Sequence, residues 1–206
     1  MPQVLKPEIR ARILSAGLEV FAAQGYLGAT MNAIAEQAGL GAASLYRYFP
    51  SKAELFEAAI TPELAARFER LLQQRVRALG AQSTAAPSER IYDHGAEMLE
   101  FWLEHRLAVV VLLDRAQGSA YEHYGELFVS LLLESTLEQI RRDGSNVQVT
   151  PAARLVLTRI FENTRIMIAT ILAHSKNPRA LREAIEAFWS YQIPGLHGFA
   201  RWVRKE

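Results

Sequence analysis

The chain has 206 residues, half of them apolar and 22% charged, and its formal net charge is +1 at pH 7. This composition predicts a packed globular protein with one sizeable core or two modest domains, and the charge gives no global argument for a nucleic-acid partner. The absence of cysteine excludes disulfides, thiol catalysis and cysteine metal sites. The longest apolar run, 107–113, is too short to span a membrane, and the first ten residues lack the apolar segment of a signal peptide. We therefore expect a soluble cytoplasmic protein without membrane association.

The first predicted helix begins near Pro7, because proline is favoured in the first helical turn. Its apolar positions recur at helical spacing and form one face, which we expect to pack under the next two helices. That face comprises Ile9, Ile13, Ala16, Gly17, Val20 and Phe21. The glycines between 25 and 28 predict a turn that leads to Thr30.

The stretch 30–52 predicts two short helices joined by a tight turn. Thr30 is a good N-cap, and the apolar residues from Met31 to Ala38 repeat at helical spacing. Gly39 ends this helix, because a residue without a Cβ takes the left-handed conformation cheaply. A second helix runs from about Ala42 to Tyr48 and ends before Pro50. This arrangement is the helix-turn-helix pattern, whose second helix enters the major groove of DNA.

The surface of the second helix suits contact with DNA. Its first residues, Ala42, Ala43 and Ser44, are small enough for close approach to base edges. Tyr46, Arg47 and Lys52 supply a hydroxyl and cations for phosphate oxygens, and Thr30 opens the motif. For an isolated motif of this length, an ordinary helical hairpin is the more frequent explanation. Residues 1–52 carry five basic and three acidic side chains, an excess too small to decide the question.

A family resemblance favours the DNA-binding interpretation. The stretches ILSAGLEVFAAQGYLGAT and MNAIAEQAGLGAASLYRYFPSKAELF make residues 9–56 resemble the DNA-binding domain of TetR-family transcriptional regulators. The most specific part is LYRYFPSKAEL, which joins an aromatic second helix to a capped third one at fixed spacing. Gly41 and Ala42 depart from the common pattern, in which a hydroxyl and a polar residue are frequent. The rest of the chain resembles the family in length and helical layout alone.

Beyond residue 50 the sequence predicts helices and no strand. Ser51 and Glu54 form a capping box that opens one long helix to about Leu79, kinked at Thr61-Pro62. A polar linker over 80–88 and a turn over 143–146 are predicted. The remaining helices are expected over about 91–102, 107–113, 121–142, 151–173 and from 178 onward, with an interruption at Pro194-Gly195. The predicted fold is all-α, with a three-helix helix-turn-helix domain, 1–50, and a larger helical effector-binding and dimerisation domain, 51–206.

The helix over 151–173 is predicted to have two partners, because it is apolar on two sides. One broad face includes Val156, Leu157 and Met167, with Thr164 as its central polar residue. The resemblance implies a homodimer formed through the last two helices. The candidate interface residues are Glu162, Ile166, Ala169 and Ala173 in this helix and Phe188 and Trp189 in the last one.

A small-molecule pocket between helices is implied by the resemblance and is compatible with several large or adaptable side chains. The candidates are Phe68, Trp102, Tyr124, Phe128, Thr164 and Met167. For any one of them plain core packing is the simpler explanation, and the Thr164 hydroxyl can bond the carbonyl of Ile160. Asp114-Arg115 is most simply a helix end with a local ion pair, although it could anchor a polar ligand at a pocket edge.

The predicted function is that of a homodimeric transcriptional repressor, released from a double-stranded DNA operator by an unknown small-molecule effector. No nucleophile elbow, Walker sequence or histidine metal motif occurs, so we expect no enzyme activity, no cofactor and no metal. The alternative is a helical-bundle enzyme or small-molecule carrier without DNA binding, in which the glycine turn is incidental.

Overall fold

The computed structural model describes residues 6–80, 89–143 and 147–204. Those ranges contain helices and turns but no strand, so the predicted all-α class is confirmed. The N-terminal helices are α1 (Pro7–Gly28), α2 (Met31–Gln37), α3 (Ala42–Tyr48) and α4 (Lys52–Ala59). They are followed by α5 (Pro62–Gly80), α6 (Glu89–Glu104), α7 (Arg106–Val110), the π-helical turn η2 (Val111–Arg115), α8 (Tyr124–Asp143), α9 (Pro151–His174) and α10 (Pro178–Arg204). None of the described helices combines the length and hydropathy needed to cross a membrane.

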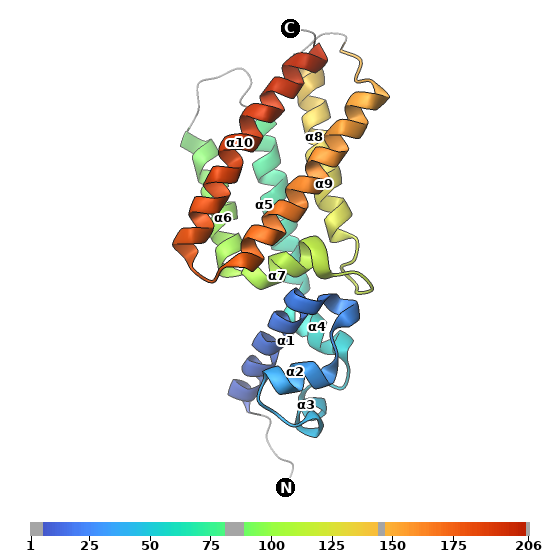
Figure 1. Ribbon diagram of the computed structural model, residues 1–206, viewed down its shortest axis with the longest axis vertical. Helices are drawn as coiled ribbons and strands as arrows, with labels where there is room; N and C mark the ends of the chain where they lie inside the picture. Colours follow the sequence, from blue (N-terminus) through green and yellow to red (C-terminus); the bar gives the residue numbers. More distant parts are fainter. Residues whose placement is uncertain (1–5, 81–88, 144–146, 205–206) are drawn as a thin grey trace.

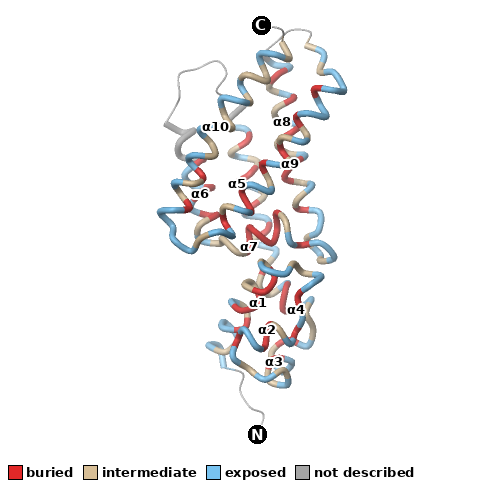
Figure 2. The backbone as a smooth tube through the Cα atoms, in the orientation of Figure 1, coloured by how far each residue is buried: buried red, intermediate tan, exposed pale blue. Residues whose placement is uncertain are grey.

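The N-terminal helices form one end of an elongated molecule, and α5, α6, α8, α9 and α10 make up the other end (Figure 1). In the N-terminal end, each of the helices α1 to α4 contains buried residues (Figure 2). The ring of Phe21 packs edge-on against Phe56 at 5.0 Å, and Ile34 and Leu45 are fully buried beside them. Because Phe56 belongs to α4, this helix shares the core of α1, α2 and α3.

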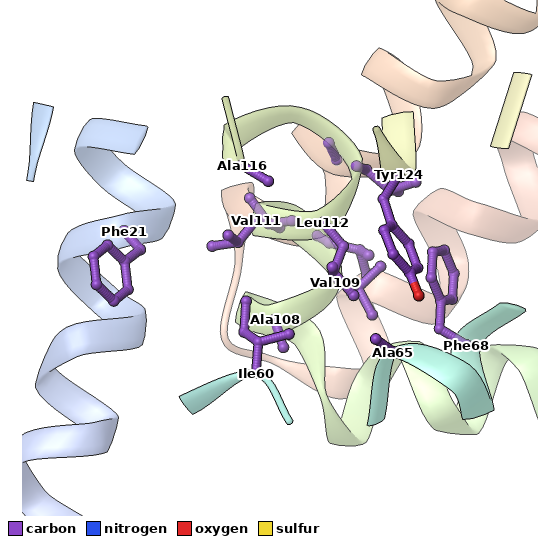
Figure 3. Close-up of a cluster of buried hydrophobic side chains, with 14 of the residues drawn as sticks. Phe21, Ile60, Ala65, Phe68, Ala108, Val109, Val111, Leu112, Ala116 and Tyr124 are labelled. Atoms are coloured by element: carbon purple, nitrogen blue, oxygen red, sulfur yellow. The ribbon is translucent and has the colours of Figure 1, made fainter. Parts of the chain in front are cut away.

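The segment formed by α7 and η2 joins the two ends of the molecule. Its buried side chains lie between Phe21 of α1 on one side and Phe68 and Tyr124 on the other (Figure 3). An aromatic contact continues the junction, since the rings of Phe56 and Tyr121 are 6.2 Å apart and Tyr121 meets Tyr124 edge-on at 5.4 Å. A change in the position of η2 would therefore directly alter its packing contacts with α1 in the N-terminal end.

The expected single helix from residue 51 to about 79 is wrong, because α4 and α5 are separate helices. The start is as predicted: the Ser51 hydroxyl oxygen accepts a hydrogen bond from the Glu54 amide at 3.2 Å. The chain leaves the helical conformation at Ile60, whose φ and ψ are −123° and 90°. Pro62 then begins α5. A proline removes a backbone donor and drives the preceding residue, here Thr61, out of the helical region, so the kink becomes a break.

The expected interruption at Pro194-Gly195 is also wrong, because α10 continues through both residues. Both lie on the exposed side of the helix. The carbonyl that loses its partner at a proline can be hydrated there, so the helix tolerates the residue. Of the other predicted boundaries, α8 begins at Tyr124, slightly later than expected, and the linker over 81–88 and the turn over 144–146 lie outside the described residues.

The two faces of α9 differ from those read from the sequence. Val156 and Met167, assigned to the broad face, are 49% and 45% exposed. Ala169, assigned to the dimer interface on the other apolar side, is buried within its own chain. The buried face runs through Leu157, Phe161, Thr164, Ile168 and Leu172. The apolar periodicity predicted the position of the helix correctly. When a helix is apolar on two sides, however, the pattern does not show which side packs against the other helices of the same chain.

Candidate functional site

The helix-turn-helix is held together by caps and turns that the sequence predicts. The Thr30 hydroxyl oxygen accepts a hydrogen bond from the Ala33 amide at 3.1 Å and caps α2. Gly39 has φ +64°, the left-handed conformation that glycine adopts cheaply. The Leu40 amide donates to the carbonyl of Ala35 at 2.9 Å and closes the turn. These bonds fix the angle at which α3 leaves α2.

Helix α3 is anchored by its apolar side and leaves the opposite side at the surface. Leu45 and Phe49 are buried, and the Arg10 guanidinium lies 5.2 Å from the centre of the Phe49 ring. The Tyr48 hydroxyl accepts a hydrogen bond from the Lys6 amide at 3.1 Å, a contact that ties the start of α1 to the end of α3. Sequence reasoning missed this contact, since nothing in the spacing of residues 6 and 48 indicates it.

Five of the seven candidate DNA-binding residues belong to α3, which lies at the N-terminal tip of the molecule (Figure 1), whereas Thr30 precedes α2 and Lys52 begins α4. Ala43, Arg47 and Thr30 are exposed, and Tyr46 is 48% exposed. The others, Ala42, Ser44 and Lys52, are half-buried. The first turn of α3 therefore presents small side chains with a hydroxyl and a guanidinium beside them, a surface that can approach base edges and phosphates.

Lys52 also has a role inside the domain. Its Nζ donates hydrogen bonds to the carbonyls of Tyr26 at 2.7 Å and Ala29 at 2.9 Å, and it lies 4.5 Å from the centre of the Tyr26 ring. These carbonyls lie beyond Gly25, where α1 is interrupted by a residue with φ +72°. The ammonium group thus holds the corner between α1 and α2. An ammonium has three donors, so one remains for another acceptor.

A second candidate site is a cavity beneath α10 in the larger end of the molecule. Its walls come from α5, α6, α8, α9 and α10, and they are mostly apolar. Trp102, Phe128 and Thr164, three of the predicted pocket residues, lie in these walls. Phe68 and Tyr124 lie elsewhere in the core, and Met167 is on the surface. The cavity is partly open to solvent.

The polar groups of the cavity include residues that sequence reasoning missed. The Thr164 hydroxyl donates a hydrogen bond to the carbonyl of Ile160 at 2.8 Å, as the core-packing explanation predicts. It also accepts a hydrogen bond from Gln192 Nε2 at 2.9 Å. Arg75 of α5 also lines the cavity, and burial lowers the pKa of its guanidinium from the ordinary value. The spacing of Phe188, Gln192 and Leu196 along one face of α10 was the signal that could have found this wall.

Comparison with known proteins places the N-terminal helices in a family. Residues 13–59 match the family model described as bacterial regulatory proteins, tetR family. Residues 13–59 therefore match the TetR family, and this match covers the N-terminal helices alone. The matched residues run from α1 to the end of α4 and include the whole helix-turn-helix.

Curated relatives of this chain are transcriptional regulators. It is 32% identical over 130 residues to the HTH-type transcriptional repressor KstR of Mycolicibacterium smegmatis, across 60% of this chain and 61% of that protein. It is 45% identical over 64 residues to KstR of Rhodococcus jostii (31% and 28%). The match to the regulator SrpR of Pseudomonas putida is 43% over 53 residues (26% and 25%). The chain thus spans less than two thirds of the length of these relatives.

Similar solved structures include NalD of Pseudomonas aeruginosa, the secondary repressor of the MexAB-OprM multidrug efflux pump. That match has 20% identity, a TM-score of 0.42 and coverage of 89% of this chain and 94% of that one. A tetR-family transcriptional regulator from Streptomyces coelicolor matches with 18% identity, a TM-score of 0.39 and coverage of 97% and 90%.

The six candidate interface residues do not form one surface. Ile166 is 45% exposed and Ala173 is also exposed, while Glu162 is half-buried and pairs with Arg159 at 2.6 Å. Ala169 is 4% exposed and packs inside its own chain. Phe188 and Trp189 line the cavity. The large exposed apolar residues of α9 and α10 are Leu155, Val156, Ile166, Met167, Tyr191 and Trp202.

Asp114 connects α9 to the junction between the two ends. It pairs with Arg115, as expected, at 3.4 Å, and also with Arg165 of α9 at 2.9 Å. The Arg165 guanidinium donates to the carbonyl of Leu113 as well. Since η2 contacts α1 and Arg165 directly follows the cavity residue Thr164, this cluster links the cavity wall to the N-terminal end.

Proposed function

We propose that the chain is a homodimeric transcriptional repressor that binds a double-stranded DNA operator and leaves it when a small molecule enters the cavity. The observation that carries the proposal is the exposed α3 at the tip of a domain that matches the TetR family. Small residues at the start of α3 are suited to base edges, and Tyr46 and Arg47 to phosphates. The repressor function of the relative KstR supports a role as a repressor for this chain.

We propose the division into a DNA-binding domain, 1–50, and an effector-binding and dimerisation domain, 51–206. Helix α4 is the element that both parts share, because it lies after the boundary but contributes Leu55 and Phe56 to the N-terminal core. A movement in the larger domain therefore reaches α3 through a packed element and not through a free linker. Two routes support this coupling: the aromatic contact of Phe56 with Tyr121, and η2 against α1.

We propose that the homodimer forms through the outward faces of α9 and α10. The support is the exposed apolar set that includes Leu155, Ile166 and Met167 on α9 and Tyr191 on α10. Large apolar side chains gathered on one surface commonly mark a site of association. Two-fold symmetry would place one α3 in each of two half-sites, separated by one turn of DNA or a multiple of it.

The experiment is a mobility-shift titration, over a range of salt, with DNA from upstream of the protein's own gene. The binding constant should fall steeply as salt rises, because phosphate contacts release counterions. Arg47→Ala should weaken binding to all sequences and lower the salt slope by about one unit. Arg141→Ala, an exposed arginine at the far end of α8, is the matched control and should leave both unchanged.

The alternative function, a carrier or enzyme without DNA binding, gives a different result in the same titration. It predicts no salt-dependent complex with any upstream fragment. Equal effects of the two arginine substitutions would contradict the assignment of α3 as the recognition helix.

A further inference from the structure

The cavity beneath α10 contains a donor that has no acceptor. Trp102 is 3% exposed and lines the cavity, and its Nε1 is buried without a hydrogen-bond partner among the described residues. A buried indole N–H usually has a partner, because leaving such a group unsatisfied costs free energy. An acceptor that enters the cavity would supply that partner.

Positive charge lies in the same cavity wall. Arg75 lines the cavity, and its guanidinium lies 5.4 Å from the centre of the Trp189 ring. Gly95 on α6 leaves space for it, since a Cβ at that position would be 3.2 Å from Cζ of Arg75. Among the described residues that line the cavity, none is acidic. An anionic group brought into the cavity would therefore meet an attractive guanidinium.

Two further polar side chains among the described lining residues, Thr164 and Gln192, bond to each other. The Thr164 hydroxyl already donates to Ile160 and accepts from Gln192. Leu72, Phe128 and Phe161 are among the apolar side chains that fill most of the other surface. The cavity thus matches a molecule with an apolar body and one acceptor group.

We propose that the cavity binds an organic carboxylate with an apolar body, whose oxygens accept hydrogen bonds from Trp102 Nε1 and the Arg75 guanidinium. This inference rests on the proposed function for its regulatory meaning, because it names the chemical class of the effector. The apolar body lies along the aromatic and aliphatic wall, where burial of apolar surface provides most of the affinity. The carboxylate provides selectivity, since hydrogen bonds to a charged group are stronger than neutral ones.

Helix α10 forms one wall of this site. Of its 27 residues, Leu181 and Ile185 are the buried ones, both in its N-terminal part. The part that lines the cavity, including Phe188, Gln192 and Leu196, is half-buried.

The test uses three probes of equal chain length: decanoate, decanol and decylamine. Each is titrated into the full-length protein without DNA, by calorimetry. Decanoate should bind at least about tenfold more tightly than decanol, the factor expected for one charge-assisted hydrogen bond, and decylamine should bind weakest. Equal affinities, a preference for the amine, or no saturable binding of decanoate would overturn the proposal.

Two pairs of variants place the bound carboxylate. Trp102→Phe removes the donor but keeps an aromatic ring, and Arg75→Met removes the charge but keeps the stem. Each should lower decanoate affinity about tenfold or more and leave decanol binding nearly unchanged. The matched controls are Trp202→Phe, which is 64% exposed, and Arg77→Met, an exposed arginine on the same helix. Retained selectivity in both cavity variants, with melting temperatures like those of the controls, would refute the assignment.

The operator complex provides a separate readout. Release of DNA by decanoate, lost in Arg75→Met, supports both the carboxylate site and its regulatory role. Operator binding without any decanoate binding overturns this inference alone and leaves the proposed function intact. Selective decanoate binding by a chain that binds no DNA supports the site and contradicts the proposed function.

Discussion

Substitution of Lys52 by methionine tests a residue that serves the fold and, in our proposal, the DNA. Methionine keeps an apolar stem over Tyr26 and removes the ammonium that bonds the carbonyls of Tyr26 and Ala29. A hydrogen bond to a charged group contributes about 1.5–3 kcal/mol. Because Lys52 is half-buried, water can replace part of the lost bonding, and we expect a loss of about 2–4 kcal/mol in the free energy of unfolding.

The assay has two parts, stability and salt dependence. Urea unfolding followed by far-ultraviolet circular dichroism measures the first, since the tryptophans all lie beyond residue 100 and do not report on the N-terminal domain. The second is the slope of log affinity against log salt, measured at a temperature where the variant remains folded. If the third donor of Lys52 contacts phosphate, the slope should fall by about one unit.

The matched control is Lys176→Met, whose side chain is 83% exposed and 4.0 Å from Glu19. An exposed ion pair contributes about 0–1 kcal/mol, so stability should change little and the slope not at all. Unchanged stability in Lys52→Met would refute the corner-holding role of the ammonium. An unchanged slope would refute its phosphate contact, whatever the effect on stability.

Four further substitutions test other parts of the structure. Gly41→Ser should stabilise the protein by about 0.5–1 kcal/mol in thermal unfolding, because Gly41 caps α3 at φ −72° with open space around its Cα; a lower melting temperature would contradict this. Ile166→Arg puts a charge on the exposed face of α9 and should give monomers in sedimentation, whereas a persistent dimer would place the interface elsewhere. Thr164→Val removes the acceptor for Gln192 and should cost about 1–3 kcal/mol of unfolding free energy, with no loss expected if that bond does not form. Arg165→Met should cost about 2–4 kcal/mol in urea unfolding, because it leaves Asp114 half-buried with one weaker partner, and a neutral effect would remove this cluster from the link to α1.

The sequence predicts helix beginnings well where a side chain caps the helix. Thr30 and Ser51 each accept a hydrogen bond from the amide three residues on, as their patterns indicate, and Thr150 does the same at the start of α9. Proline was less informative, because its effect depends on its environment. Pro62 ends up at a break between α4 and α5, whereas Pro194 lies within a continuous helix whose exposed side tolerates the lost bond.

The two candidate sites also differ in how well the sequence predicts them. The residues of α3 are neighbours in sequence, so one short motif is enough to place them on one surface. The cavity instead depends on side chains from five helices, and the tertiary contacts that join Thr164 to Gln192 or bring Arg75 beside Trp189 leave no mark in the spacing of residues. For the same reason Ala169 was assigned to an interface although its own chain buries it.

The position of α10 has a consequence for anyone who would alter this protein into a sensor for another compound. Phe188, Trp189 and Gln192 line the cavity, while Tyr191, 79% exposed, lies between them in sequence on the opposite side of the same helix. A library that reshapes the binding wall with bulkier side chains will also shift the outer surface through which, in our proposal, two copies recognise each other. Selection for a new compound should therefore be followed by a check for subunit exchange with the parent protein. Changes on α5 and α6, such as at Leu72 or Met98, reach the same cavity from the far side and leave that surface in place.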